Sequence, residues 1–166
     1  MLIRRESPAD GSGIDEVHRR AFPGPVEADL VHALRADAGW VPALSLVAED
    51  AGGMVVGHVV CTEGAVVETA VVGLGPIGVL PHLQRTGVGS ALMHAVIAAA
   101  DALDYPLVAL LGHLDYYPRF GFVPASSLGV TAPEPKWGDH FQARPLAGWH
   151  AGLEGVFRYA APFQAL

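Results

Sequence analysis

The sequence predicts one layered α/β (α+β) domain over residues 1–166, and three observations support this. The length of 166 residues is that of a single domain. Hydrophobic residues make up 51% of the chain and charged residues only 16%, so there is enough apolar material for a buried core. Several β-rich segments precede an amphipathic stretch, and a short apolar segment follows it. Strands, a crossover helix and another strand are typical of packed layers of sheet and helix.

The first half of the chain carries strand and helix signals in alternation. Strands are predicted over residues 2–5, 44–48, 54–62 and 66–80, and helices over 14–22 and 26–37. The Pro-Gly-Pro at 23–25 separates the two helices, because proline and glycine break helical periodicity. The polar EDAGG at 49–53 joins two apolar, β-branched segments and predicts a hairpin between them.

The second half begins with the clearest helix. Apolar side chains fall at positions 88, 91, 92, 95, 96, 99 and 103, the spacing of an amphipathic helix of about four turns. The apolar residues 106–111 predict a strand buried on both faces. A helical turn at 115–120, a strand at 121–124, a loop over 126–149 rich in proline and glycine, and a last strand at 153–159 are expected after it.

Charge and residue usage exclude several function classes. A net charge of −7 argues against a nucleic-acid partner, which binds basic surfaces. Lys136 is the only lysine, which leaves little room for chemistry that depends on a lysine. Cys61 is the only cysteine, so an internal disulfide and a cysteine-based zinc cluster are excluded. The histidines show no metal-ligand spacing, and we expect no metal.

Nothing in the sequence predicts a membrane segment. The N-terminus, MLIRRE, runs directly into charged residues and lacks the apolar core of a signal peptide. The most apolar stretch, residues 65–83, is interrupted by Glu68, Pro76 and Pro81 and does not fit a span of about 20 apolar residues. We therefore expect a cytoplasmic protein without a membrane partner.

One glycine motif is misleading. Residues 73–78, GLGPIG, match the dinucleotide-binding pattern GxGxxG, but that pattern requires a helix to start at the glycines and an acidic residue about 20 positions later. Here the chain stays extended to Pro81, and no acidic residue occurs between Glu68 and Asp101. Glycines that let another backbone approach a strand explain the segment better.

A better anion site follows at residues 84–90, QRTGVGS. This segment lies immediately before the amphipathic helix, so its backbone N–H groups are the unpaired donors of a helix N-terminus. Gly87 and Gly89 let a ligand approach the main chain, and Arg85 adds a positive charge. Such a loop suits a diphosphate. It is not a Walker loop, because no Gly-Lys-Ser or Gly-Lys-Thr is present.

With its neighbours, this loop resembles a known family. QRTGVG at 84–89 is similar to the Gln/Arg-x-x-Gly-x-Gly/Ala pyrophosphate loop of the GCN5-related N-acetyltransferase (GNAT) superfamily. YYPRFGF at 116–122 is similar to the family's Tyr-x-x-x-Gly-Phe segment. The longer phrase 112–125 resembles a bacterial branch, the YhbS-like predicted acetyltransferases. The resemblance is strong over residues 74–125.

The resemblance implies a fold and a co-substrate. It implies a mostly antiparallel central sheet with helices on both faces, in which two parallel strands, 74–80 and 107–111, splay apart. Acetyl-CoA would be the donor, a primary amine of a small molecule or peptide the acceptor, and a homodimer is common in the family. The residues expected to bind acetyl-CoA are Ile77, Gly78 and Val79 at the gap and Gln84, Arg85, Thr86, Gly87, Val88, Gly89 and Ser90 in the loop.

The resemblance also implies catalytic groups. Tyr117 stands four residues before Gly121, where the family carries its general acid, and a phenol can donate a proton to the leaving thiolate. Tyr116 is assigned to packing. Many relatives carry a strand glutamate where this chain has Gly73, so the base stays open between Glu68, His113, Asp115 and a water relay. Aromatic residues in the expected acceptor-side loops are Phe22, Trp40, Trp137 and Trp149.

Three function hypotheses result. The first is an acetyl-CoA-dependent N-acetyltransferase that uses direct aminolysis. The second is a non-catalytic acyl-CoA-binding or sensing module on the same fold, suggested by the missing strand carboxylate. The third is a dinucleotide-dependent oxidoreductase, which rests on the GxGxxG match alone.

Overall fold

A nine-stranded sheet forms the centre of the computed structural model, which describes residues 1–166. Its strands are β1 (Leu2–Arg5), β2 (Trp40–Glu49), β3 (Val55–Val66), β4 (Thr69–Val79), β5 (Leu107–Leu111), β6 (Val123–Pro124), β7 (Val130–Thr131), β8 (Phe141–Pro145) and β9 (Gly155–Arg158). The main order is β1-β2-β3-β4-β5-β8-β6, and β9 joins β3 to β7. Only β4–β5 and β7–β9 are parallel pairs. The expected mixed, mostly antiparallel sheet is confirmed.

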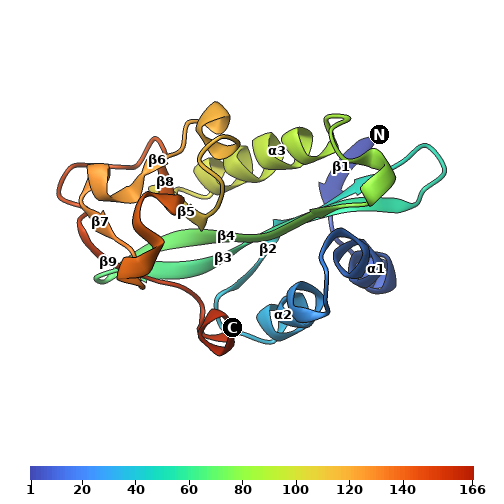
Figure 1. Ribbon diagram of the computed structural model, residues 1–166, viewed down its shortest axis with the longest axis horizontal. Helices are drawn as coiled ribbons and strands as arrows, with labels where there is room; N and C mark the ends of the chain where they lie inside the picture. Colours follow the sequence, from blue (N-terminus) through green and yellow to red (C-terminus); the bar gives the residue numbers. More distant parts are fainter.

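Helices cover both faces of this sheet. The helices α1 (Gly11–Ala21) and α2 (Val26–Arg35) lie on one side of it, and α3 (Val88–Ala102) lies on the other (Figure 1). The break between α1 and α2 falls at the predicted Pro-Gly-Pro segment. Short 3₁₀ turns connect the strands, among them one at Tyr117–Phe120. None of the helices is long and apolar enough to cross a bilayer.

The helix α3 has the predicted extent, but its buried face is rotated from the predicted one. Its buried residues are Val88, Leu92, Met93, Val96, Ile97 and Ala100. The expected core residue Leu103 is instead 44% exposed. The small Ala91, Ala95 and Ala99 line only the edge of the buried stripe, because the wider side chains at 93 and 97 fill the space over the sheet.

Two regions differ from the sequence prediction. The segment predicted as one strand over 66–80 contains a tight turn, in which Val67 adopts a left-handed backbone, φ +55°, and reverses the chain from β3 into β4. The predicted loop over 126–149 contains β8, which pairs with β5 from Leu107↔Pro145 to Leu111↔Phe141. Gln142 and Arg144 interrupt the apolar pattern of β8. Their side chains bond Gly112 O and Phe120 O instead of facing water.

The parallel strands β4 and β5 separate soon after they meet. They pair only at Val72↔Val108 and Gly73↔Ala109, although β4 continues to Val79. On its other edge β4 stays paired with β3 as far as Gly57↔Val79. One edge of β4 is therefore open beyond Gly73, which confirms the expected splayed pair.

Candidate active site

The loop before α3 is held in shape by two side-chain hydrogen bonds. Gln84 Nε2 donates to Val79 O at 3.1 Å, and Thr86 Oγ1 donates to Leu83 O at 2.6 Å. Arg85 and Gly87 both have positive φ, +63° and +100°. Gly87 is the N-cap residue of α3. Of the two, Gly87 adopts its conformation without steric cost.

This loop presents a row of free donors. The backbone N–H groups of residues 85–90 make no hydrogen bond to the protein, and the first helical bond runs from Ala91 N to Gly87 O at 3.0 Å. No atom lies within 4 Å of a Cβ built on Gly87. The cradle is thus open, and the helix dipole makes it favourable for an anion. The side chain of Val88 is buried in the core, so this residue offers only its main chain.

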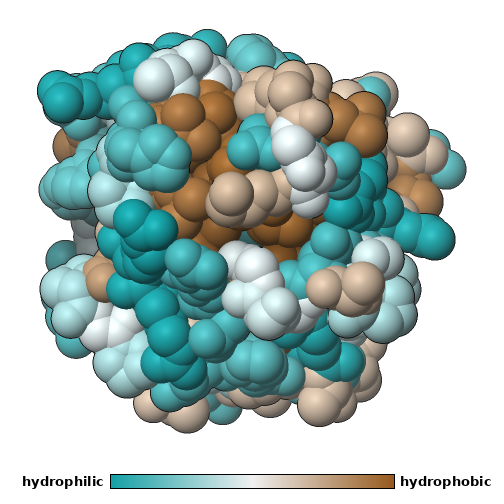
Figure 2. All heavy atoms as spheres, turned by 90° about the vertical axis from the view of Figure 1, so that its right-hand side faces the viewer, coloured by the Kyte–Doolittle hydropathy of each residue, from teal (hydrophilic) through white to brown (hydrophobic).

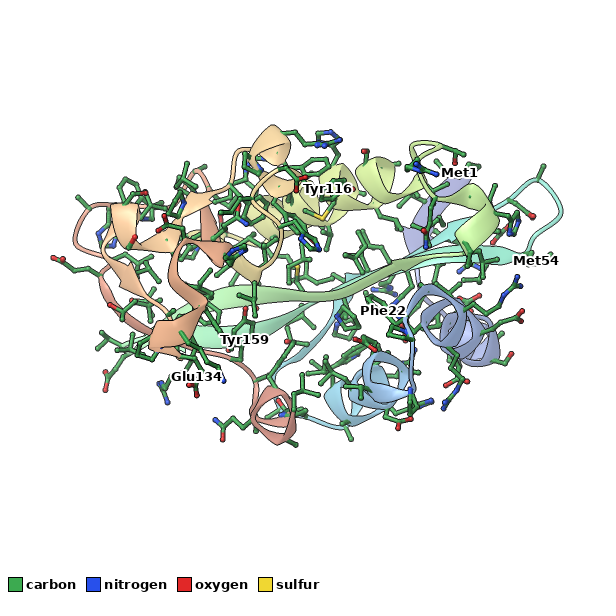
Figure 3. All side chains as sticks on the ribbon, in the orientation of Figure 1. Met1, Phe22, Met54, Tyr116, Glu134 and Tyr159 are labelled. Atoms are coloured by element: carbon green, nitrogen blue, oxygen red, sulfur yellow. The ribbon has the colours of Figure 1, made fainter.

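Tyr116 lies beside the same loop, which sequence reasoning missed. A Cβ on Gly89 would lie 3.3 Å from the Tyr116 hydroxyl oxygen. The guanidinium of Arg119 lies over the Tyr116 ring, 4.6 Å from its centroid. Figure 3 shows Tyr116 on the α3 side of β4. A hydroxyl and a guanidinium therefore stand close to the free N–H groups. The only signal in the sequence was the repeated tyrosine at 116–117.

The open edge of β4 presents main-chain groups of alternate residues. Leu80 N donates to Val56 O at 3.0 Å, and Gly78 pairs with His58. Because main-chain direction alternates along a strand, the groups of Ile77 and Val79 point away from β3, toward the splayed side. The main-chain groups of Gly78 point to β3, and a Cβ built on it would lie 3.0 Å from His18 Nδ1 of α1. Among the three residues expected at the gap, Ile77 and Val79 direct main-chain groups into it.

Tyr117 follows β5 and packs against Gly112. A Cβ on Gly112 would lie 2.6 Å from Tyr117 Cδ2, and the rings of Tyr116 and Phe122 are 5.0 and 6.1 Å away, centroid to centroid. Burial raises the pKa of Tyr117 to about 12, with a smaller contribution from Tyr116. The hydroxyl has no hydrogen-bond partner in the protein and is not sealed in the interior. It is therefore a protonated donor at neutral pH.

Comparison with known proteins identifies the family. Residues 42–124 match the acetyltransferase (GNAT) domain. The chain is 37% identical to an uncharacterized N-acetyltransferase, YjhQ of Escherichia coli K12, over 93% of this chain and 89% of the relative. It is 36% identical to a second, YhbS of the same strain, over 98% of both chains. The chain belongs to the GNAT acetyltransferase family.

Solved GNAT structures agree with this assignment. The crystal structure of YhbS from Escherichia coli in complex with CoA has a TM-score of 0.89 and 34% identity, covering 98% of this chain and 91% of that one. A GNAT acetyltransferase from Brucella melitensis in complex with acetyl-CoA has a TM-score of 0.79 and 31% identity, covering 98% and 97%. The expected resemblance to the YhbS-like branch is confirmed.

An aromatic ring fills the space beside Gly73, the position noted above for its missing strand carboxylate. A Cβ on Gly73 would lie 2.6 Å from Cδ1 and Cε1 of Tyr159. Tyr159 follows β9, which joins the sheet next to the end of β3. The ring thus occupies the space into which a side chain at position 73 would project. Sequence reasoning did not single out Tyr159, because its neighbour in space is 86 positions away.

The three candidate bases lie in different places. Glu68 is exposed in the turn that precedes β4, at the opposite end of that strand from Val79. His113 and Asp115 lie in the loop between β5 and Tyr117, and both are exposed. Tyr117 N donates to His113 O at 3.4 Å. Only His113 and Asp115 therefore share a loop with the candidate acid.

A pocket of about 740 Å³ opens where the two strands separate. Leu74, Gly75 and Pro76 of β4 and Leu111 of β5 line it. Among the four aromatic residues expected on the acceptor side, only Trp137 lines this pocket. Phe22 stacks on His18, Trp40 lines a separate pocket of about 460 Å³, and Trp149 packs against the core formed with β8 and β9.

The end of the molecule that carries the start of α3 is hollowed. Figure 2 looks at this end and shows hydrophobic surface within a hollow in the upper half, with hydrophilic side chains around it. The loop with the free N–H groups of residues 85–90 lies at this end of the molecule, and the open edge of β4 runs toward it (Figure 1). Contiguous apolar surface of this kind is typical of a ligand groove.

Proposed function

We propose that the protein is an acetyl-CoA-dependent N-acetyltransferase that moves an acetyl group to a primary amine by direct aminolysis. One observation carries the proposal. The open edge of β4, with the main-chain groups of Ile77 and Val79, runs directly into the free N–H groups of residues 85–90. A row of main-chain donors that ends at a helix N-terminus fits an extended ligand with a diphosphate at one end.

The residues of the chain suit the parts of acetyl-CoA. The N–H groups of the loop, the Arg85 guanidinium and the α3 dipole would hold the diphosphate. Ile77 and Val79 would bind the amide-containing arm through their main chain. Gln84 already bonds Val79 O, so its contribution is to fix the loop to the strand. Acetyl-CoA is a co-substrate here, and the proposed transfer requires no metal.

Tyr117 is the proposed general acid. In the transfer a C–N bond forms, the C–S bond breaks and the sulfur leaves with the electron pair. A thiol has a pKa near 8.5, which is below that of a phenol, near 10. The thiolate therefore accepts a hydrogen bond from a neighbouring phenol more readily than it accepts the proton itself. The raised pKa of Tyr117, about 12, keeps the hydroxyl protonated at neutral pH, so it can donate a hydrogen bond to the negative charge that develops on the sulfur.

The incoming amine must lose a proton. An amine of pKa near 10.4 is neutral in only about one molecule in two thousand at pH 7. His113 and Asp115, in the loop that carries Tyr117, and a water relay are the proposed routes for this proton. We also propose a cytoplasmic location, in keeping with a substrate as polar as acetyl-CoA.

A second candidate function is an acyl-CoA-binding or sensing module. The observation that favours it is the ring of Tyr159 over Gly73, which leaves no carboxylate on the strand beside the gap. Such a module would bind acetyl-CoA through the same loop and release no CoA.

Two measurements on the purified protein separate these functions. Isothermal calorimetry with acetyl-CoA, CoA and NADH should show saturable binding of the first two alone. Thiol release, followed with a thiol-reactive dye across a panel of primary amines, should depend on the amine added. Acetyl-CoA binding without release on any amine would favour the sensing module. Binding of NADH without CoA would overturn both functions.

A further inference from the structure

The pocket of about 740 Å³ lies where an acceptor must sit if the proposed function holds. Its strand side consists of Leu74–Pro76 on β4 and Leu111 on β5, the residues at which the two strands have just separated. Glu27 and Leu30 of α2 close the opposite side. A molecule in this pocket would therefore contact the gap from the α2 face, while Tyr116 lies on the α3 side of β4 (Figure 3).

Aromatic rings form one wall of this pocket. Tyr159 stands at their centre, with its ring centroid 4.7 Å from that of Phe157, 4.6 Å from that of Phe163 and 6.2 Å from that of Trp137. All four residues line the pocket: Phe157 comes from β9, Tyr159 follows it, Phe163 lies in the last 3₁₀ turn and Trp137 in the turn before β8. Phe157 is fully buried and supports the other three rings from behind. Adjoining rings offer flat apolar area that stacks best on another planar or bulky apolar group.

The charged residues around the pocket balance one another. Two carboxylate side chains, Glu27 and Glu134, and two cationic side chains, Lys136 and Arg158, line it. A polyamine or an aminoglycoside carries several positive charges and needs a surplus of carboxylates to replace its lost hydration. The lining of this pocket has no such surplus. A ligand with one amino group fits its charge better.

The apolar strand side of the pocket would also assist the reaction. A cation that moves into apolar surroundings is disfavoured relative to its neutral form, and the pKa of an amine falls there. The strand side of the pocket offers Leu74, Pro76 and Leu111, so an amino group that reaches the gap passes through apolar surroundings. The same contacts that select the body of the acceptor thus favour its reactive, neutral state.

We infer that the acceptor is a monoamine whose primary amino group is attached to an aromatic or bulky apolar group, bound between the aromatic wall and the open ends of β4 and β5. This inference rests on the proposed function and adds the substrate class to it. It assigns Trp137, Tyr159 and Phe163 to recognition of the acceptor, and gives none of them a part in acetyl-CoA binding.

The test compares amines of different classes on the wild-type protein. 2-Phenylethylamine and tryptamine represent the inferred class, ethanolamine the small polar monoamines, and spermidine and kanamycin the polycations. We expect kcat/KM for these two arylalkyl amines to exceed that of each other amine at least tenfold. Equal or better transfer to ethanolamine, spermidine or kanamycin would overturn the inference and leave the proposed function standing. Acetyl-CoA binding without transfer to any amine would overturn both.

A variant pair tests the assigned wall. Trp137→Ala should raise KM for 2-phenylethylamine at least fivefold and leave the Kd of acetyl-CoA unchanged. Trp149→Ala is the matched control, because both side chains pack against the same core but only Trp137 lines the pocket. If Trp137→Ala loses its fold, Phe163→Leu, which keeps the apolar volume and removes the ring, replaces it. An unchanged KM in a folded variant contradicts the assignment.

Discussion

His18 and His58 form a direct hydrogen bond between imidazole rings, with 2.8 Å between His18 Nε2 and His58 Nδ1, and both side chains are fully buried. This series of hydrogen bonds continues from His58 Nε2 to Ser45 Oγ at 2.8 Å and from Ser45 Oγ to Glu6 Oε2 at 2.5 Å. An ionised carboxylate only accepts hydrogen bonds, so Ser45 donates to Glu6 and His58 donates to Ser45. His18 must then donate to His58, which leaves its Nδ1 without a proton.

This neutral pair makes stability depend on pH. Burial lowers the pKa of His18 to about 3. The charges of His58 and Arg35 lower it further by smaller amounts, and that of Asp15 raises it. Burial also lowers the pKa of His58, against the opposing influence of Glu6. Below pH 6.5 the unfolded chain takes up protons that the folded state refuses, so stability falls as the pH falls. Between pH 6.5 and 5, His18 alone should account for a loss of about 2 kcal/mol.

Urea unfolding at a series of pH values measures this dependence. The loss should begin near pH 6.5, before the carboxylates titrate, and continue toward pH 3. His18→Gln should flatten the curve between pH 6.5 and 5, whereas His150→Gln, at an exposed position, should not. A free energy of unfolding that stays constant over this interval in the wild type would contradict the buried neutral pair.

Glu6 should contribute more to the free energy of unfolding than a surface glutamate does. Burial would raise the pKa of Glu6, but the nearby His58 Nε2, 3.4 Å from Glu6 Oε2, and hydrogen bonds from Arg35 and Ser45 outweigh this effect and hold the pKa at about 2. Arg35 contributes Nε at 2.8 Å and a second bond at 3.2 Å. Glu6→Gln removes the charge and leaves these donors poorly matched, at a cost of about 1–3 kcal/mol.

The control for Glu6 is Glu16→Gln. Glu16 also has an arginine partner, Arg20 at 3.3 Å, but both side chains are exposed. Its loss should change the free energy of unfolding by less than about 0.5 kcal/mol, because exposed pairs contribute little. Equal losses for the two variants, measured by urea unfolding at pH 7, would show that Glu6 does not organise the buried network.

Gly87 should be essential for acetyl-CoA binding. Its φ of +100° is unfavourable for other residues, and a larger side chain would also enter the cradle of free N–H groups. Gly87→Val should weaken acetyl-CoA binding at least tenfold by calorimetry. The control is Gly24→Val, since Gly24 has ordinary φ and no atom within 4 Å of a Cβ. A folded Gly87→Val variant that binds acetyl-CoA as the wild type does would rule out the loop.

Much of the fold could be predicted from local patterns. The helix from Val88, the break at residues 23–25 and the early strands each follow from periodicity or from turn residues close together in the sequence. The strand β8 was missed because two of its five residues are polar, and the groups that satisfy Gln142 and Arg144 belong to residues 112 and 120. Such partners are set by tertiary contacts and leave no local signal.

The candidate site divides in the same way. The residues 84–90 form a continuous motif, and their free N–H groups follow from the start of a helix. The ring of Tyr159 over Gly73 and the bond between His18 and His58 join segments that are 86 and 40 positions apart. A single sequence contains no information on such pairs. The identity of the acceptor-side aromatic residues was equally hidden, and only Trp137 among the four expected lines the pocket.

The general-acid role of Tyr117 is tested most directly by the turnover of Tyr117→Phe. This variant removes one hydroxyl that has no hydrogen-bond partner in the protein, so the fold and the Kd of acetyl-CoA should be unchanged while kcat falls at least about tenfold. Tyr116→Phe should have a smaller effect on kcat. Tyr105 lies outside the loop, and its hydroxyl donates to Glu63 at 2.6 Å. Tyr105→Phe should therefore leave kcat unchanged. A kcat for Tyr117→Phe within twofold of the wild type would remove this phenol from the mechanism.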